Sequence, residues 1–209
     1  IEAIICLDVS RSMLARDVTP SRLDKAKMLI SSMVDNMTND KLGLIIFAGD
    51  AFTQLPITSD YVSAKMFLDH ISPDLIEVQG TDLAHAIEIA MHNFTPTEGV
   101  AKAIFVITDG EDHEGGAEEM AKKAAGEGFN IFILGVGSPD GAPVPMTPLG
   151  NDYITDETGR TVVSKLNVEM CQSIAKAGNG AYVYVDNSSS AQSALAKHLN
   201  RLQKAEVES

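Results

Sequence analysis

Residues 3–12 read AIICLDVSRS, an apolar run that ends in the polar residues Asp8, Ser10 and Ser12. A continuous apolar run of this kind is typical of a strand buried on both faces of a sheet. The carboxylate and the two hydroxyls follow at alternate positions on the loop that leaves the strand. Hard cations take oxygen ligands of this type and keep bound water. The stretch therefore predicts a buried strand that delivers a cation site at its end.

Further strands and helices are predicted along the rest of the chain. The strands are expected at about 41–48, 51–58, 101–109, 130–137 and 180–186. The helices are expected at about 22–37, 60–71, 82–93, 117–126, 166–177 and 189–204. Strands that are apolar throughout and alternate with amphipathic helices indicate a mostly parallel sheet with helices on both faces. The predicted class is α/β, with a doubly wound, mostly parallel six-stranded sheet.

Two local signals refine this prediction. The strands at 41–48 and 51–58 are separated only by Gly49 and Asp50, so they must form an antiparallel hairpin. Pro56 then indicates that the second of them is an edge strand, because proline cannot donate to a central ladder. Ser21, followed three residues later by Asp24, predicts the start of the first helix.

The length favours one domain, residues 1–209. A chain of 209 residues fits a single domain, which buries roughly 70% of its unfolded surface. Residues 138–165 are polar and rich in proline and glycine, and they contain two short strand-like pieces, NDYITD (151–156) and RTVVS (160–164). We expect these residues to form a surface insertion folded as an elaborated hairpin, with a C-terminal helix at 189–204.

The composition argues against several classes of function. The formal net charge is −13, and the 16 lysines and arginines are scattered, whereas nucleic-acid binding needs clustered basic residues. No apolar run approaches the roughly 20 residues of a membrane span. Cys6 and Cys171 are expected to be buried thiols, because two cysteines are too few for a disulfide framework or a zinc site. Since the chain starts at Ile1 inside a predicted strand, we expect a fragment of a longer protein.

Three predicted loops bring oxygen donors to one edge of the sheet. They hold Asp8, Ser10 and Ser12 after the first strand, Thr81 in QGTDL, and Asp109 in ITDG. Ligands of such sheets bind at the carboxyl ends of the strands. Two carboxylates and three hydroxyls, without clustered sulfur or imidazole, favour Mg²⁺ or Mn²⁺ over zinc, and Ca²⁺ less because it prefers more carboxylates. An acidic side chain of a partner would fill the open position of such a cation.

Each of these residues also has a purely local interpretation. Ser10 and Ser12 are common turn formers, and Asp109 precedes a glycine, as in many turns. Thr81 could cap a helix that begins at Asp82. The joint pattern, with all five residues at the predicted ends of strands in one sheet, favours metal binding over the separate explanations.

The same residues resemble a known site. DVSRS (8–12), the GTD with Thr81 and the ITDG with Asp109 resemble the metal-ion-dependent adhesion site (MIDAS) of von Willebrand factor A (VWA) domains, a fold also seen in integrin inserted domains. The resemblance covers about residues 1–137 and matches all five positions. It implies a Rossmann-like VWA fold, and it makes Asp8, Ser10, Ser12, Thr81 and Asp109 the candidate metal ligands. It also implies a module that binds a protein ligand through that ligand's acidic residue.

A narrower resemblance concerns three segments. DVSRSMLARDVTPSRLDKAK (8–27), GSPDGAPVPM (137–146) and VVSKLN (162–167) are similar to the Bacteroides aerotolerance (Bat) proteins BatA and BatB. This resemblance implies a VWA domain held between membrane segments that are absent from this chain, with the soluble part in the periplasm. Other Bat proteins and a MoxR-type AAA ATPase are the implied partners.

Two alternative functions are weighed against the binding module. A magnesium-dependent phosphotransferase with Asp8 as nucleophile, in the manner of haloacid-dehalogenase-like phosphatases, needs a second carboxylate two positions later, where this chain has Ser10. A serine hydrolase is not indicated either, since no GxSxG motif occurs. A scaffold that has lost its metal would not need the complete ligand set. The sequence therefore predicts a binding module that is not an enzyme.

Overall fold

Six strands form one sheet in the order β3-β2-β1-β4-β5-β8. The structure is a computed structural model that describes residues 1–112 and 114–208. The strands are β1 (Glu2–Asp8), β2 (Lys41–Phe47), β3 (Ala51–Thr58), β4 (Lys102–Thr108), β5 (Asn130–Val136) and β8 (Tyr182–Val185). All neighbouring pairs are parallel except β2 with the edge strand β3. This sheet confirms the predicted fold class.

The central strands are buried on both faces. Side chains of β1 alternate between two apolar clusters, so that Ile5 and Leu7 face one layer and Ile4 and Cys6 face the other. Strand β4 repeats the pattern. Burial on both faces explains why these strands appear in the sequence as continuous apolar runs. Cys6 and Cys171 are both buried free thiols, as predicted.

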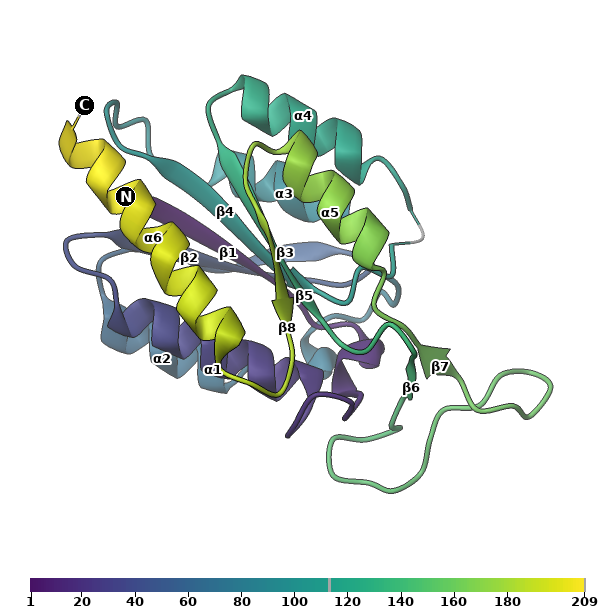
Figure 1. The fold of residues 1–209 in the computed structure, drawn as a ribbon. Coiled ribbons are helices and arrows are strands. Elements are labelled where there is room, and N and C mark those ends of the chain that lie inside the picture. Colours follow the sequence, from purple (N-terminus) through teal and green to yellow (C-terminus); the bar gives the residue numbers. More distant parts are fainter. Residues whose placement is uncertain (113, 209) are drawn as a thin grey trace.

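Helices cover the sheet in two layers (Figure 1). One face carries α1 (Arg22–Asp35), α2 (Tyr61–Asp69) and α6 (Ser190–Glu208), and the other carries α3 (Leu83–His92), α4 (Ala117–Gly126) and α5 (Val168–Ala177). Two short 3-10 helices, η1 (Arg11–Leu14) and η2 (Pro73–Leu75), lie in the connecting loops. No helix within the described residues combines the length and the apolar character needed to cross a membrane.

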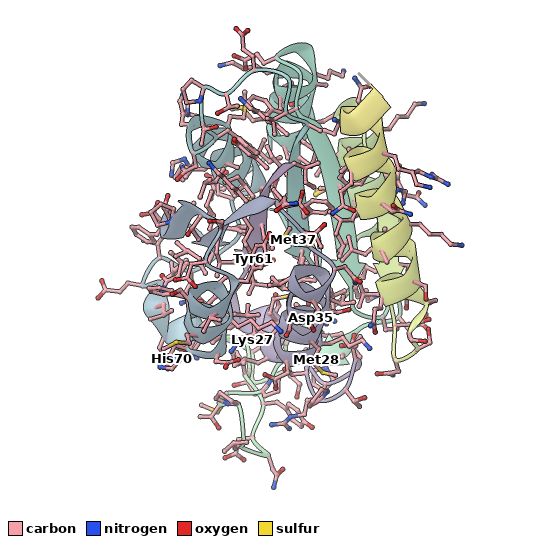
Figure 2. All side chains as sticks on the ribbon, turned by 90° about the vertical axis from the view of Figure 1, so that its left-hand side faces the viewer. Lys27, Met28, Asp35, Met37, Tyr61 and His70 are labelled. Atoms are coloured by element: carbon pink, nitrogen blue, oxygen red, sulfur yellow. The ribbon has the colours of Figure 1, made fainter. Side chains whose placement is uncertain are left out.

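Side chains of α1 and α2 join these two helices to each other and to the sheet (Figure 2). The Tyr61 hydroxyl donates to the Asp40 carbonyl at 2.6 Å and accepts from the Asp40 amide at 3.0 Å, just before β2. Asp35 receives a hydrogen bond from Lys65 of α2. The helix predicted for 22–37 ends at Asp35, although Met37 is still buried.

The segment 138–165 forms a hairpin that projects beyond the sheet (Figure 1). Strands β6 (Ala142–Pro143) and β7 (Val163–Ser164) pair as a separate two-stranded sheet. The predicted piece 151–156 forms isolated bridges instead of a continuous strand, Pro145 with Tyr153 and Thr155 with Thr161. Residues 151–156 are therefore less regular than expected, because Tyr153 pairs with the segment before them and Thr155 with the segment after them. We propose that this hairpin is an insertion within a single domain, 1–209.

Ser21 fixes the start of α1 and thereby the place of Arg22, the first residue of that helix. The Ser21 side chain accepts from the Asp24 amide at 3.0 Å, as the capping-box spacing predicted. We expect Ser21→Ala to cost about 1 kcal/mol. For a domain of this size, that lowers Tm by about 2–4 °C in thermal unfolding followed by circular dichroism. Ser31→Ala, in the middle of the same helix, is the control and should leave Tm nearly unchanged. Equal effects of the two changes would contradict this role for Ser21.

Candidate metal centre

The candidate site lies where the strand order of the sheet reverses. From the central β1 the chain first adds β2 on one side and later β4 on the other. Asp8 is the last residue of β1, and Asp109 directly follows the end of β4. In open α/β sheets the crevice beside such a switch point is the usual ligand site. The structure thus sets the two predicted carboxylates on neighbouring strands at this position.

Four of the five predicted residues form one hydrogen-bonded chain across two loops. Asp8 Oδ1 accepts from the Ser10 amide at 2.9 Å and from Ser10 Oγ at 2.7 Å. Ser12 Oγ donates to Asp109 Oδ2, and the two serine oxygens are 3.0 Å apart. The 3-10 helix η1 begins directly after Ser10 and turns the loop back, with the Met13 amide bonded to the Ser10 carbonyl.

The contact between the two serine oxygens competes with the carboxylates for the hydroxyl protons. Each hydroxyl has one hydrogen, either serine can donate to the other, and each also lies within hydrogen-bond distance of a carboxylate, Ser10 of Asp8 and Ser12 of Asp109. When both hydroxyls donate to their carboxylates, the two oxygens face each other with lone pairs at 3.0 Å. Such a pair is favourable when a positive charge lies between or beside the oxygens. This geometry fits a bound cation.

Thr81 is buried in the third loop, next to the end of β2. Its exposed fraction is 3%. The Asp82 amide donates to the Ala48 carbonyl at 2.7 Å, which ties this loop to the residue after β2. The cap of α3 is Asp82, which accepts from the His85 amide, so the interpretation of Thr81 as the helix cap is wrong. Among the described residues, no hydrogen bond links the Thr81 hydroxyl to the other four candidates.

The local turn roles predicted as alternatives are present as well. Asp109 Oδ1 accepts from the Glu111 amide at 3.2 Å, and Asp8 holds the Ser10 amide in the same manner. Each carboxylate thus uses one oxygen to shape its own loop. The Asp109 oxygen Oδ2 is the one that reaches Ser12 of the other loop. Turn formation and the shared cluster therefore coexist.

Burial raises the free energy of the charged site. Asp8 and Asp109 are both fully buried. Burial, and then the charge of Asp109, raises the pKa of Asp8 to about 7, against the opposing effect of hydrogen bonds from Ser10 and Thr108. Thr108 Oγ1 donates to Asp8 Oδ2 at 2.7 Å, so Asp8 has hydrogen bonds at both oxygens. A nearby cation would favour the ionised form of this pair.

Arg22 is the positive charge that the structure supplies. Its guanidinium is fully buried and donates to Asp109 Oδ2 at 3.2 Å. It also binds both carboxylate oxygens of Asp17, at 2.8 and 2.7 Å, and Ser164 of the hairpin, at 2.7 Å. A Cβ on Gly137 would lie 2.7 Å from the guanidinium, so only glycine leaves room for it. Arg22 thus contacts the carboxylates of Asp17 and Asp109, and the charge of Glu111 also acts on it.

The sequence analysis missed several residues that support the site. Arg22, Asp17, Thr108 and Ser164 were not singled out, because their partners are distant in sequence or lie outside the motif. One signal was present for Arg22. It shares the buried stripe of α1 with Ala26, Ile30 and Met33 at helical spacing, where a charged residue needs a buried partner.

The donor set is chemically uniform. Within residues 1–112 and 114–208, no group of three or more His, Cys, Asp and Glu side chains is arranged to hold a metal. The candidate site instead combines two carboxylates with hydroxyls, all hard oxygen donors. With one arginine against the carboxylates of Asp8, Asp17 and Asp109, it keeps negative charge for a divalent cation. The residues therefore fit a hard divalent cation.

Comparisons with known proteins agree with this fold. A family model for the von Willebrand factor type A domain matches residues 3–111. The chain is 60% identical to the solved structure of BatB from Bacteroides thetaiotaomicron, with a TM-score of 0.94 over 98% of this chain and 99% of that one. It is 59% identical to an aerotolerance-related membrane protein from Bacteroides fragilis, with a TM-score of 0.92 over 96% and 99%.

More distant relatives are longer proteins. A protein of Borreliella burgdorferi, described as uncharacterized, is 32% identical over 66% of this chain and 41% of its own length. The chain spans 31% to 55% of the lengths of three such curated relatives. Proximal thread matrix protein 1 from the mussel byssus was solved with a zinc-occupied MIDAS motif. It is 17% identical, with a TM-score of 0.68 over 98% of this chain and 45% of that one, a likeness of fold alone.

Asp8→Asn should stabilise the metal-free domain. The folded-state pKa of Asp8 is about 7, above its ordinary value of 3.8, so its contribution to stability falls as pH rises from about 4 to about 7. Asparagine carries no charge and removes this cost. At pH 8 in chelator, we expect the Asp8→Asn protein to be more stable than the wild type by about 1–2 kcal/mol, which raises its Tm by a few degrees. At pH 4, close to the ordinary pKa of 3.8, the two should be nearly equal.

The exposed Asp140→Asn is the matched control for this experiment, because it removes one carboxylate at the same sheet edge without touching the cluster. It should not change Tm at either pH. A metal-free Asp8→Asn protein that is less stable than the wild type at pH 8 would contradict the argument.

Arg22→Met should strongly destabilise the fold. Methionine keeps most of the apolar stem but leaves buried carboxylates without their cation, a loss that costs about 3–5 kcal/mol. We expect a fall in Tm of about 10 °C. The exposed Arg160→Met on the hairpin is the control and should change little. Adding Asp17→Asn to Arg22→Met should recover part of the loss. An Arg22→Met protein as stable as the wild type would exclude this role.

Proposed function

The chain belongs to the von Willebrand factor type A domain family, and on that basis we propose that it is a protein-binding module that uses a divalent cation to hold an acidic residue of its partner. The family assignment and the similarity to BatB confirm both resemblances noted in the sequence. VWA domains mediate protein interactions. The cation and the acidic ligand are the specific parts of our proposal.

One observation carries the proposal. Ser10 Oγ and Ser12 Oγ lie 3.0 Å apart, and each is also within hydrogen-bond distance of a different carboxylate. Two hydroxyl oxygens, each oriented by an aspartate, are preorganised to offer lone pairs to the same cation. The burial of Asp8 and Asp109 also supports a bound cation, since ionised carboxylates in a buried site require compensating positive charge.

The proposed ligands are the five residues of the sequence pattern: Asp8, Ser10, Ser12, Thr81 and Asp109. The cation would supply electrophilic binding of a carboxylate. Mg²⁺ and Mn²⁺ are the proposed metals, because every donor is a hard oxygen, and Ca²⁺ is disfavoured by the low number of carboxylates. The zinc in the mussel protein belongs to that protein. We attribute no zinc to this site.

We infer that the module has no catalytic activity of its own. None of the compared proteins described above carries a catalytic name. A phosphotransferase with Asp8 as nucleophile needs an acid two residues later, and the residue there, Ser10, is a neutral hydroxyl already bonded to Asp8. The metal-free scaffold is the remaining alternative, and the orientation of the two serine hydroxyls argues against it.

The similarity to an aerotolerance-related membrane protein supports a membrane-anchored role. Both labelled ends of the chain lie at the end of the sheet opposite the hairpin and the candidate site (Figure 1). Gln203 of α6 donates to Asp40, at the amino end of β2, at 2.7 Å. We propose a periplasmic domain of a Bat-type membrane protein, with other Bat proteins and a MoxR-type AAA ATPase as partners. An attachment through either end would present the site away from the bilayer.

Metal binding should depend on the predicted ligands. In calorimetric titration with MnCl₂ or MgCl₂, we expect one site in the wild type. Ser12→Ala and Asp109→Asn should each weaken it at least about tenfold, because each removes a ligand and the partner of a hydrogen bond that orients another.

Asp140→Asn serves again as the control, and circular dichroism should show that each variant is folded. The Asp140→Asn protein should bind metal like the wild type. This control tests whether the general negative charge of the domain explains the metal uptake. Equal affinity in the wild type, Ser12→Ala and Asp109→Asn would refute the site.

A further inference from the structure

The hairpin 138–165 is fastened to the loop that holds two of the candidate ligands. Arg11 lies between Ser10 and Ser12, and its Nη1 donates to the Met146 carbonyl at 3.4 Å. Arg16 donates to the Pro148 carbonyl at 3.1 Å and to the Gly150 carbonyl at 2.6 Å. These contacts hold the tip of the hairpin beside the candidate metal site.

A cavity of about 320 Å³ separates the hairpin from the rest of this edge. Its apolar lining comes from three separate segments, with Leu14 from η1, Pro73 from η2, and Met146 and Pro148 from the hairpin. The Met146 side chain is 52% exposed, although its backbone is tied to the loop. The volume is near the lower end of the range for ligand pockets, and it is sufficient for one large apolar side chain.

The charged residues of this cavity indicate what kind of occupant it favours. Arg11, which is exposed, and Asp74 both line it, so one positive and one negative side chain are available to an occupant. Within the described part of the chain, Arg11 makes only the one long hydrogen bond, so its other N–H groups are available to an acceptor. A negatively charged group of an occupant is therefore favoured at Arg11, which stands between Ser10 and Ser12 in the chain.

We propose that this cavity binds a large apolar side chain from an extended segment of a partner protein, next to the acidic residue that reaches the metal. The proposal rests on the function proposed above. Its occupant follows from the apolar walls of the cavity and from Arg11, which lines the cavity, stands between Ser10 and Ser12 in the chain, and can bind an acidic group. The cavity would thereby select among acidic partners, since the cation alone recognises only the carboxylate.

A peptide array tests the proposal. The probe is a set of immobilised peptides of the form acetyl-X-X-Asp-X-X-amide, incubated with the labelled 209-residue chain in Mg²⁺ or in chelator. We expect Leu, Met or Phe at one fixed position relative to Asp to strengthen Mg²⁺-dependent binding about tenfold over Gly at that position. Met146→Ser should reduce this preference to about twofold or less, with the preference for Asp over Asn unchanged.

Leu149→Ser is the matched control. Leu149 belongs to the same hairpin and is 96% exposed, but it does not line the cavity, so this change should leave the apolar preference intact. Mg²⁺-dependent selection of Asp without any apolar preference would overturn the cavity proposal and leave the proposed function standing. An apolar preference that survives Met146→Ser would overturn it too. Binding independent of both Mg²⁺ and Asp would overturn both proposals.

Discussion

The burial of two carboxylates on neighbouring strands is the constraint around which this edge of the molecule is built. Asp8 and Asp109 are fully buried at the ends of β1 and beyond β4. Ionised carboxylates in such a position require hydrogen bonds and positive charge. Ser10, Ser12 and Thr108 provide the hydrogen bonds, and among the residues that the structure describes Arg22 is the cation that contacts Asp109.

Arg22 also explains how distant segments are held together. Its guanidinium binds Asp17 in the β1–α1 loop, Asp109 after β4 and Ser164 in the hairpin. Asp17 in turn accepts from the Ser138 amide at 2.7 Å, at the start of the hairpin segment. A planar group with five donors can serve several acceptors at once, which a lysine cannot do with the same geometry. The site and the hairpin therefore share one hydrogen-bond network, so a change in one alters the contacts of the other.

Most of the fold could be predicted because its signals are local. Apolar runs marked the strands, Gly49 and Asp50 marked the hairpin, and Ser21 marked a helix start. The candidate cluster could be predicted in part, since Asp8, Ser10 and Ser12 are neighbours in sequence. The role of Arg22 could not, because it depends on partners 5, 87 and 142 residues away. The irregular pairing inside the hairpin was missed because its segments exchange partners.

The neutrality of Ser10 decides what this edge can do. A carboxylate at that position would add a third negative charge beside Asp8 and Asp109 and would provide the acid that phosphoryl transfer requires. A hydroxyl instead donates its proton to Asp8 and leaves its lone pairs for a cation. The site then keeps a moderate negative charge, that of two carboxylates with one arginine beside Asp109. Such an arrangement can hold a cation firmly while leaving it attractive to an incoming carboxylate, which is the property a metal-mediated binding surface needs.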